Sequence, residues 1–377
     1  MSFDNTIELA EKYTTLLDEK YKVESRTGIL DAQDELVRDS MDAKTIFTPR
    51  IDTSGLGDYD RNSGFNRGKV DVNWEAHTFT QDRGTQFQID EADNLETLEV
   101  AFGRASGEFI RVEVAPEIDA YRFSTMANKA ENSEDENLSA STVVQAIDIA
   151  HEEMDNAEVP DDGRIIFCNP TVWRLLKQSD LLERYVDVES GQEMVNRNIR
   201  SLDGRPIVKV PQSRFNTAIL QKDVDENNDG GFEAAGNPIN FMIVHDGAVL
   251  PITKLDGLRI FDPATNQQAR GWLFDYRVYH DIFVPNNKTE GIYVHTAELF
   301  DVTFEVDDGS SNDIEGANVT VNGVFVKETD EDGNTEAFEL ADGTYSYVVE
   351  KDGDEVEGEF TVDGADKTVT VSDATFA

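Results

Sequence analysis

The sequence predicts an α+β protein that ends in an all-β sandwich, and three stretches of the chain indicate this. Apolar and polar residues alternate on both sides of Asp82-Arg83-Gly84, which is typical of a long two-stranded hairpin. Residues 109–123 carry apolar side chains at helical spacing. From residue 302 onward, short β-prone runs alternate with glycine-containing turns about every 8–12 residues, the pattern of a sandwich.

Length and composition indicate a globular protein of several domains. The 377 residues are enough for two or three domains, and 38% hydrophobic residues exclude global disorder. The first residues lack the apolar segment of a signal peptide, and no run of about 18 apolar residues follows, so we expect no membrane partner. Cys168 is the single cysteine, which excludes an intrachain disulfide.

The charge of the chain indicates its milieu. The formal net charge is −44, and arginine outnumbers lysine. Such an acidic excess resembles proteins of organisms that hold molar salt inside the cell. At about 1 M salt the Debye length is about 3 Å, so the self-repulsion of the chain is screened. We therefore expect a high-salt protein, with an acidic protein of a mesophile as the alternative. No basic patch predicts sequence-specific binding of nucleic acid.

Two segments near the N-terminus have apolar sides without a local partner. Residues 2–24 place apolar side chains at helical spacing, namely Ile7, Ala10, Tyr13, Leu17 and Tyr21. In the predicted hairpin, residues 70–74 pair with residues 87–89 around a turn at residues 82–84. A two-stranded hairpin is marginally stable alone, so we expect its apolar side to need a neighbour.

The helix predicted over residues 109–123 carries one main apolar stripe, formed by Ile110, Val114, Ile118 and Tyr121. Pro116 lies inside this helix. Because proline has no N–H, the carbonyl of Val112 loses its partner, and we expect the helix to bend there.

The middle of the chain alternates predicted helices and strands. Asn169 precedes Pro170 and is the expected cap of a short helix. Asp203-Gly204 is the expected turn between two short strands. In chain order, we predict an acidic break (131–138), a helix (139–157), a buried strand (164–168), the capped helix (171–178), the strand pair (199–210), a solvated acidic loop (222–231) and strands at 241–244 and 272–284.

No pattern supports catalysis, a cofactor or a metal. None of the five histidines has another at i+3 or i+4, and Cys168 lies in an apolar run whose burial makes a thiol inert. The residues from Asp330 to Gly333 resemble the start of a calcium loop, but Ala341 occupies the twelfth position, so a solvated β-turn is the better interpretation. The glycine-rich residues 55–68 lack the ending of a phosphate loop. We therefore expect a protein that is not an enzyme.

Several motifs within residues 1–300 resemble one viral family. They are GLGDYDRNSGF, WE followed by TFTQDRG and FQID, GEFIR with PEIDAYRFS, GRIIFCNPTVWRLLKQS and SLDGRPIVKVPQSRF. These segments resemble the major capsid proteins of tailed viruses, which have the Hong Kong 97 phage fold. The resemblance implies an N-terminal arm (1–57), an extension-loop hairpin (58–95), a peripheral domain with its spine helix (96–139 and 259–301) and an axial domain (140–258). Residues 302–377 resemble the immunoglobulin-like and prealbumin-like modules of surface proteins.

The resemblance also implies a function and partners. The subunit would self-assemble, as hexamers and pentamers, into the icosahedral shell of a virion that encloses double-stranded DNA without reading its sequence. Assembly would occur in the host cytoplasm with portal and scaffolding proteins, and decoration proteins are further candidate partners. Combined with the acidic composition, the resemblance implies a virus of a haloarchaeon and a C-terminal domain on the outer face of the shell.

We expect contacts between subunits at residues of the arm and the hairpin, namely Ile7, Tyr13, Trp74, Phe79, Arg83 and Phe87. Some relatives join a loop lysine to a neighbour's asparagine by an isopeptide bond, for which the candidates are Lys69 and either Asn286 or Asn287. We expect non-covalent contacts instead, because the sequence indicates neither a carboxylate near this pair nor exclusion of water.

Two other functions stay open. A nanocompartment shell of the same fold would enclose an enzyme, and the content of the particle distinguishes it from a virus. A cell-surface adhesin is suggested by the C-terminal sandwich, although the absence of a signal peptide argues against it.

Overall fold

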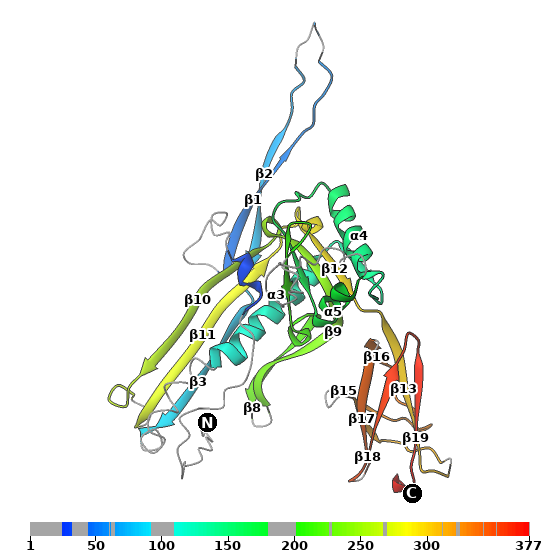
Figure 1. Ribbon diagram of the computed structural model, residues 1–377. Coiled ribbons are helices and arrows are strands. Elements are labelled where there is room, and N and C mark those ends of the chain that lie inside the picture. Colours follow the sequence, from blue (N-terminus) through cyan, green and yellow to red (C-terminus); the bar gives the residue numbers. More distant parts are fainter. Residues whose placement is uncertain are drawn as a thin grey trace, which may run out of the picture.

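The computed structural model describes residues 25–31, 44–59, 61, 65–91, 109–179, 201–225, 228–266, 270–310, 312–321, 325–341, 343–351 and 353–376. Figure 1 shows a hairpin that projects from one end, a body of sheets and helices, and a C-terminal β-domain that stands beside the body. The described chain is therefore an α+β protein with an additional all-β domain, as predicted. None of the described helices is long and apolar enough to cross a membrane.

The projecting hairpin consists of β1 (Thr45–Thr53) and β2 (Val70–Thr78), which pair antiparallel along their whole length. The predicted pairing of residues 70–74 with residues 87–89 is therefore wrong. Residues 45–53 belong to the hairpin rather than to the N-terminal arm. The reason is that β1 also alternates apolar and polar residues, so β2 has a partner that precedes it in the chain.

After β2 the chain crosses into a second sheet. The Phe79 amide still donates to the Lys44 carbonyl (2.8 Å), whereas the next amide, that of Thr80, donates to Asp281 Oδ2 (2.8 Å). From there β3 (Gln81–Asp90) pairs with β11 (Gly271–Phe283), and β11 pairs with the edge strand β10 (Leu250–Phe261).

Residues 82–84 lie inside β3, so the predicted turn at this position is also wrong. Gly84 serves a close approach instead of a turn. A Cβ at this position would lie 2.8 Å from the Tyr276 carbonyl oxygen of the neighbouring strand, which only glycine avoids.

The spine helix lies across the face of this second sheet (Figure 1). A π-helical turn, Ile110–Val114, leads into α3 (Ala115–Lys129). Pro116 lies in the first turn of α3, where a missing N–H is tolerated, and the wider π-helical turn takes up the irregularity expected at Val112. The predicted apolar stripe is confirmed, because Ile110, Val114 and Ile118 pack with Tyr276 and Val278 of β11.

A central sheet forms the middle of the body. Its strand order is β4-β12-β9-β5-β7-β6, and β8 pairs with β9 beside this path. The predicted strands at 164–168, 241–244 and 272–284 are confirmed. The predicted acidic break at 131–138 instead contains the edge strand β4, and the predicted acidic loop at 222–231 lies largely in the paired strands β8 and β9. The bounds are β4 Asn132–Asp135, β5 Arg164–Cys168, β6 Ser201–Leu202, β7 Arg205–Lys209, β8 Asn216–Asp225, β9 Asn228–His245 and β12 Ile292–Thr296.

Two apolar cores cover the two faces of the central sheet. On one face α3 packs Phe123 and Met126 against alternate residues of β5, β9 and β12. On the other face lie α4 (Val143–Asn156) and α5 (Pro170–Gln178). The predicted apolar face of α4 is buried, and the predicted cap of α5 is confirmed because Asn169 Oδ1 accepts from the Val172 amide at 2.7 Å.

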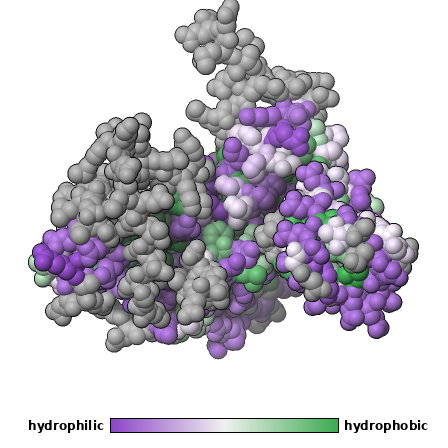
Figure 2. All heavy atoms as spheres, turned by 90° about the horizontal axis from the view of Figure 1, so that it is seen from below, coloured by the Kyte–Doolittle hydropathy of each residue, from purple (hydrophilic) through white to green (hydrophobic). Residues whose placement is uncertain are grey.

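The C-terminal domain is a two-sheet sandwich around Phe304, whose ring contacts Phe338, Tyr347 and Phe360. Figure 2 shows hydrophilic residues spread over its described surface, at the right of that view. One sheet has the order β16-β13-β19 and the other β15-β14-β17-β18. The bounds are β13 Leu299–Asp307, β14 Asn318–Val321, β15 Phe325–Glu328, β16 Phe338–Ala341, β17 Gly343–Lys351, β18 Asp354–Val362 and β19 Lys367–Ser372.

Candidate functional site

One face of the projecting hairpin is mostly apolar and is open to solvent. The register places Pro49 opposite Trp74 and Ile51 opposite Val72, so these side chains share a face with their second neighbours along each strand. The exposed fractions of its large side chains are 39% for Phe47, 65% for Ile51, 66% for Val70, 54% for Val72 and 50% for Trp74. A contiguous exposed apolar face of this kind marks an interaction site.

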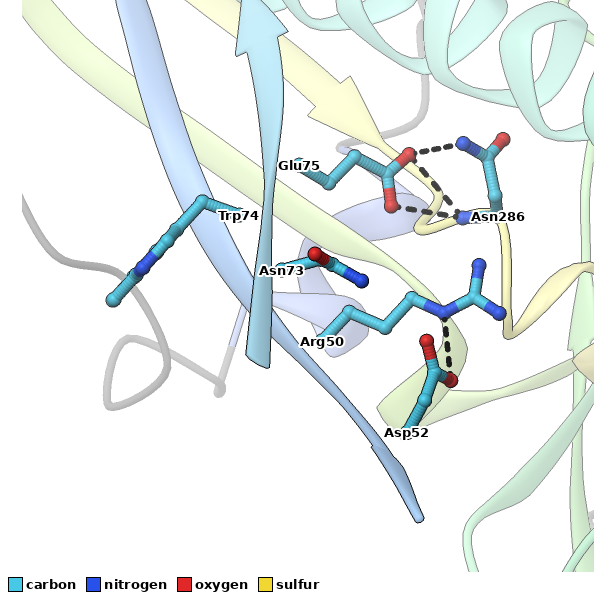
Figure 3. A pocket seen from close by; sticks show the side chains of 6 residues that line it. All are labelled: Arg50, Asp52, Asn73, Trp74, Glu75 and Asn286. Carbon is cyan, nitrogen blue, oxygen red and sulfur yellow. Dashed lines mark hydrogen bonds and ion pairs between the residues drawn. The ribbon is translucent and has the colours of Figure 1, made fainter. Parts of the chain in front are cut away.

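The opposite face of the hairpin is polar and is tied to the body. An open pocket of about 360 Å³ lies here, lined by Arg50, Asp52, Asn73, Trp74, Glu75 and Asn286. Figure 3 shows that the Trp74 ring points away from the other five side chains. The Glu75 carboxylate accepts hydrogen bonds from Asn286 Nδ2 (2.5 Å) and from the Asn286 amide (3.3 Å). Asn286 follows β11, so this contact holds the base of the hairpin at one angle to the body.

The base of the polar face is completed by His77, whose Nε2 lies 2.9 Å from the Thr48 hydroxyl. Burial lowers the pKa of His77, although the nearby Glu75 opposes the shift. Lys69 pairs with Asp71 and Asn286 with Glu75, so these two isopeptide candidates have separate partners within one subunit. A carboxylate does therefore lie beside Asn286, which the sequence did not indicate.

The predicted contact residues differ in how exposed they are. Trp74 is half exposed on the apolar face of the hairpin. Phe79 is buried at the corner between the sheets, against Tyr279 and Phe283 of its own chain, so its ring has almost no free surface for a neighbour. Phe87 packs on Phe274 and Phe109, again within the subunit. Ile7 and Tyr13 lie outside the described residues.

Arg83 connects elements of one subunit. Its Nε donates to Glu117 of α3 (2.7 Å), and its Nη2 donates to the carbonyls of Lys222 (2.9 Å) and Gly231 (3.1 Å) in the β8–β9 ribbon. Arg83 therefore clamps this ribbon to the spine helix. It belongs to β3, which the predicted hairpin had placed away from the body.

Sequence reasoning missed half of the apolar face, namely Phe47, Pro49 and Ile51 of β1. The signal was present, because these residues alternate with polar ones as in any half-buried strand. Nothing in that alternation shows which other strand is the partner.

The described residues contain no evident catalytic or metal site. No group of three or more His, Cys, Asp and Glu in that part of the chain could hold a metal ion. Burial raises the pKa of the Cys168 thiol to about 12, so the thiol stays protonated at neutral pH. Asp330 Oδ1 accepts from the amides of Asp332 (3.0 Å) and Asn334 (2.9 Å), which confirms the turn interpretation for this segment.

Known structures resemble the fold of this chain. A chain of Mycobacterium phage Che8 matches with a TM-score of 0.52 and 15% identity, over 78% of this chain and 98% of that chain. The mature capsid of bacteriophage PhiM1 matches with a TM-score of 0.53 and 13% identity, over 76% and 91%. The chain has the Hong Kong 97-type capsid fold.

The head structure of Helicobacter pylori bacteriophage KHP40 shows the same capsid fold, with a TM-score of 0.51 and 13% identity, over 77% of this chain and 94% of that chain. No protein-family model and no curated protein matches the sequence.

Proposed function

We propose that this protein is the major capsid subunit of a tailed virus and builds the icosahedral shell around its double-stranded DNA. Its role is then structural rather than enzymatic, and its place is the virion. The observation that carries the proposal is the exposed apolar face of the hairpin, together with the capsid fold. Portal and scaffolding proteins would be its assembly partners in the host cytoplasm.

A second copy of the chain is the occupant that best fits this face. The hairpin is a two-stranded ribbon, which cannot bury its own apolar side, and its polar side is already held by Asn286 of the body. The ribbon projects beyond the body in Figure 1, and Figure 3 shows the Trp74 side chain pointing away from Asn286 of the body. A shell of identical subunits offers every hairpin one neighbour in the same orientation.

The test compares two adjacent residues on opposite faces of β2. Trp74→Ala should leave a soluble, folded subunit but reduce the yield of shells, because an aromatic anchor at an interface contributes about 2 kcal/mol or more to binding. Asn73→Ala, on the polar face, is the matched control and should assemble nearly as well as the wild type. Sedimentation and electron microscopy measure assembly. Misfolding of the Trp74 variant as a monomer would place the hairpin in the core of the subunit and contradict the proposal.

We further propose that the virus infects a haloarchaeon. The net charge of −44 makes copies of the chain repel each other, and only strong salt screens this repulsion. Shells should loosen when salt falls toward 0.1 M, at which the Debye length is about 10 Å. Intact shells after long dialysis into dilute buffer without divalent cations would rule out the high-salt milieu.

The C-terminal sandwich is proposed to stand on the outer face of the shell, as an immunoglobulin-like module that stabilises and solubilises the particle. Its exposed strand positions are largely acidic, for example Glu355, Glu357 and Glu359 of β18, and an inward position would set them against DNA. A chain that ends at Glu298, before β13, should still assemble. A density map with this domain inside the shell, or loss of all particles on truncation, would refute the placement.

A nanocompartment of the same fold is the second candidate function. The content of purified particles decides between the two: DNA supports the virus, and an enclosed enzyme supports the nanocompartment.

A further inference from the structure

The spine helix carries a buried carboxylate that the proposed function does not use. Asp119 is fully buried, and it lies on the same side of α3 as the core residues Phe123 and Met126. A buried carboxylate is strongly destabilising unless hydrogen-bond donors and an opposite charge surround it. The hydrogen-bond donors around Asp119 therefore identify the segment that this carboxylate binds.

Most of these donors come from a segment more than ninety residues earlier in the chain. This segment, residues 25–31, is called the strap here. Asp119 Oδ1 accepts from the Ser25 hydroxyl (2.8 Å), the Thr27 hydroxyl (2.7 Å) and the Thr27 amide (3.1 Å). Asp119 Oδ2 accepts from the Arg26 amide at 2.8 Å.

Two buried arginines complete a socket for the strap. Arg214 Nη1 lies 3.1 Å from Asp119 Oδ2 and supplies the opposite charge. Arg122 Nη1 donates to the Thr27 hydroxyl (3.1 Å) and pairs with Asp31 (2.9 Å), at the far end of the strap. The Thr27 hydroxyl thus accepts from Arg122 and donates to Asp119, which a methyl group cannot do.

An apolar anchor holds the same end of the strap as Asp31. Leu30 is 1% exposed and belongs to the same core as Phe123 and Phe215. The strap is a single 3₁₀ turn, Thr27–Leu30, too short to be stable by itself. Its conformation is therefore imposed by the socket on α3, and not by its own sequence.

We propose that the socket of Asp119, Arg122 and Arg214 is the fixed origin of the N-terminal arm, so that it sets where the arm leaves the subunit toward its neighbours. The inference rests on the proposed shell function, because an arm needs an origin only if it reaches another subunit. Asp119 is then a positioning residue, because it orders the strap from which the arm would begin.

The test uses a protease site that lies within the strap. The bond that trypsin cuts after Arg26 joins the two residues whose amides both donate to Asp119. Cleavage there requires that the strap first leave the socket. Thr27→Val removes one hydroxyl and both of its hydrogen bonds, so cleavage after Arg26 should become at least about tenfold faster. Mass spectrometry identifies the product that begins at position 27.

Three further variants separate positioning from folding. Ser25→Ala, at the edge of the socket, should also speed cleavage after Arg26. It replaces the Thr27 variant in the test if that variant folds poorly. Thr27→Ser keeps the hydroxyl and should restore protection. Thr303→Val removes a hydroxyl from an exposed pair in the sandwich, where Thr303 lies 3.2 Å from Thr368, and should change nothing.

Assembly is measured on the same full-length proteins at high salt. Variants with an unprotected strap should form fewer shells, while the tryptophan fluorescence of the body stays native. If Thr27→Val is cleaved after Arg26 at the wild-type rate, the socket does not hold the strap. If it is cleaved faster but still gives the full yield of shells, the socket is not the origin of the arm. If the wild type itself forms no shells, the proposed function fails, whereas protection of Arg26 still reports on the socket.

Discussion

Replacing His280 with glutamine should remove part of the acid sensitivity of the subunit. His280 is buried on β11, where its ring packs against Tyr121, and Nδ1 has no hydrogen-bond partner among the described residues. Burial, together with nearby Arg122, lowers the pKa of His280 from 6.5 to about 4, although Asp281 and Asp256 oppose the shift.

The sign of the effect follows from which state binds the proton. Between pH 6.5 and about 4, the imidazole is protonated in the unfolded chain but neutral in the folded one. The unfolded state therefore binds more protons, and stability falls as the pH is lowered through this window. Lowering the pKa from 6.5 to about 4 corresponds to about 3 kcal/mol in full, so a drop in pH from 7.5 to 4.5 should cost about 2 kcal/mol of stability through this residue.

The assay is denaturant unfolding at both pH values, followed by tryptophan fluorescence. The tryptophans are Trp74 in the hairpin and Trp173 and Trp272 in the body, so the signal reports on these two parts and not on the C-terminal sandwich. The loss of stability between pH 7.5 and 4.5 should be about 2 kcal/mol smaller for His280→Gln than for the wild type. An equal loss would refute the reasoning, whatever the stability of the variant at neutral pH.

A second histidine provides an independent check on the other side of the body. Burial lowers the pKa of His151 to about 4 as well, with Arg205 and Arg164 adding to the shift. His151→Gln should reduce the same loss by a similar amount. The effects should add in the double variant, because the two residues lie in different layers and share no partner.

Three local predictions concern α5, the buried strand and the short turn. Asn169→Ala removes the cap of α5 and should cost about 1 kcal/mol or more of unfolding free energy, because the buried amide also donates to Gln212 Oε1; an unchanged unfolding free energy would show that the cap does not contribute. Cys168 should not react with a thiol reagent at pH 8 until the subunit unfolds, and rapid reaction of the native protein would contradict its burial. Gly204→Ala should cost about 1 kcal/mol through backbone strain alone, because φ is +83° and no atom lies within 4 Å of the new Cβ; an unchanged unfolding midpoint would contradict this.

The sequence by itself determined the features that depend on neighbours within a few residues. The apolar stripe of the spine helix, the Asn169 cap and the Asp203-Gly204 turn all lie where they were predicted. Each is set by side chains one turn or one strand position apart, so the local pattern contains the whole cause. The burial of Cys168 was likewise predictable, because it lies in an uninterrupted apolar run.

Only the tertiary structure decided which strands pair and which side chains remain exposed. The alternation in β2 is satisfied equally by β1 or β3, and β3 pairs instead with β11, where Phe87 meets Phe274. For the same reason Phe79 and Arg83 are contacts within the subunit, and β1 supplies half of the apolar face. Asp119 interrupts an apolar helix face in the sequence, but its partners lie more than ninety residues away. An alternating strand requires a partner strand, and a buried charge requires hydrogen-bond donors and an opposite charge. Only the folded chain brings these partners near, because they lie far away in the sequence.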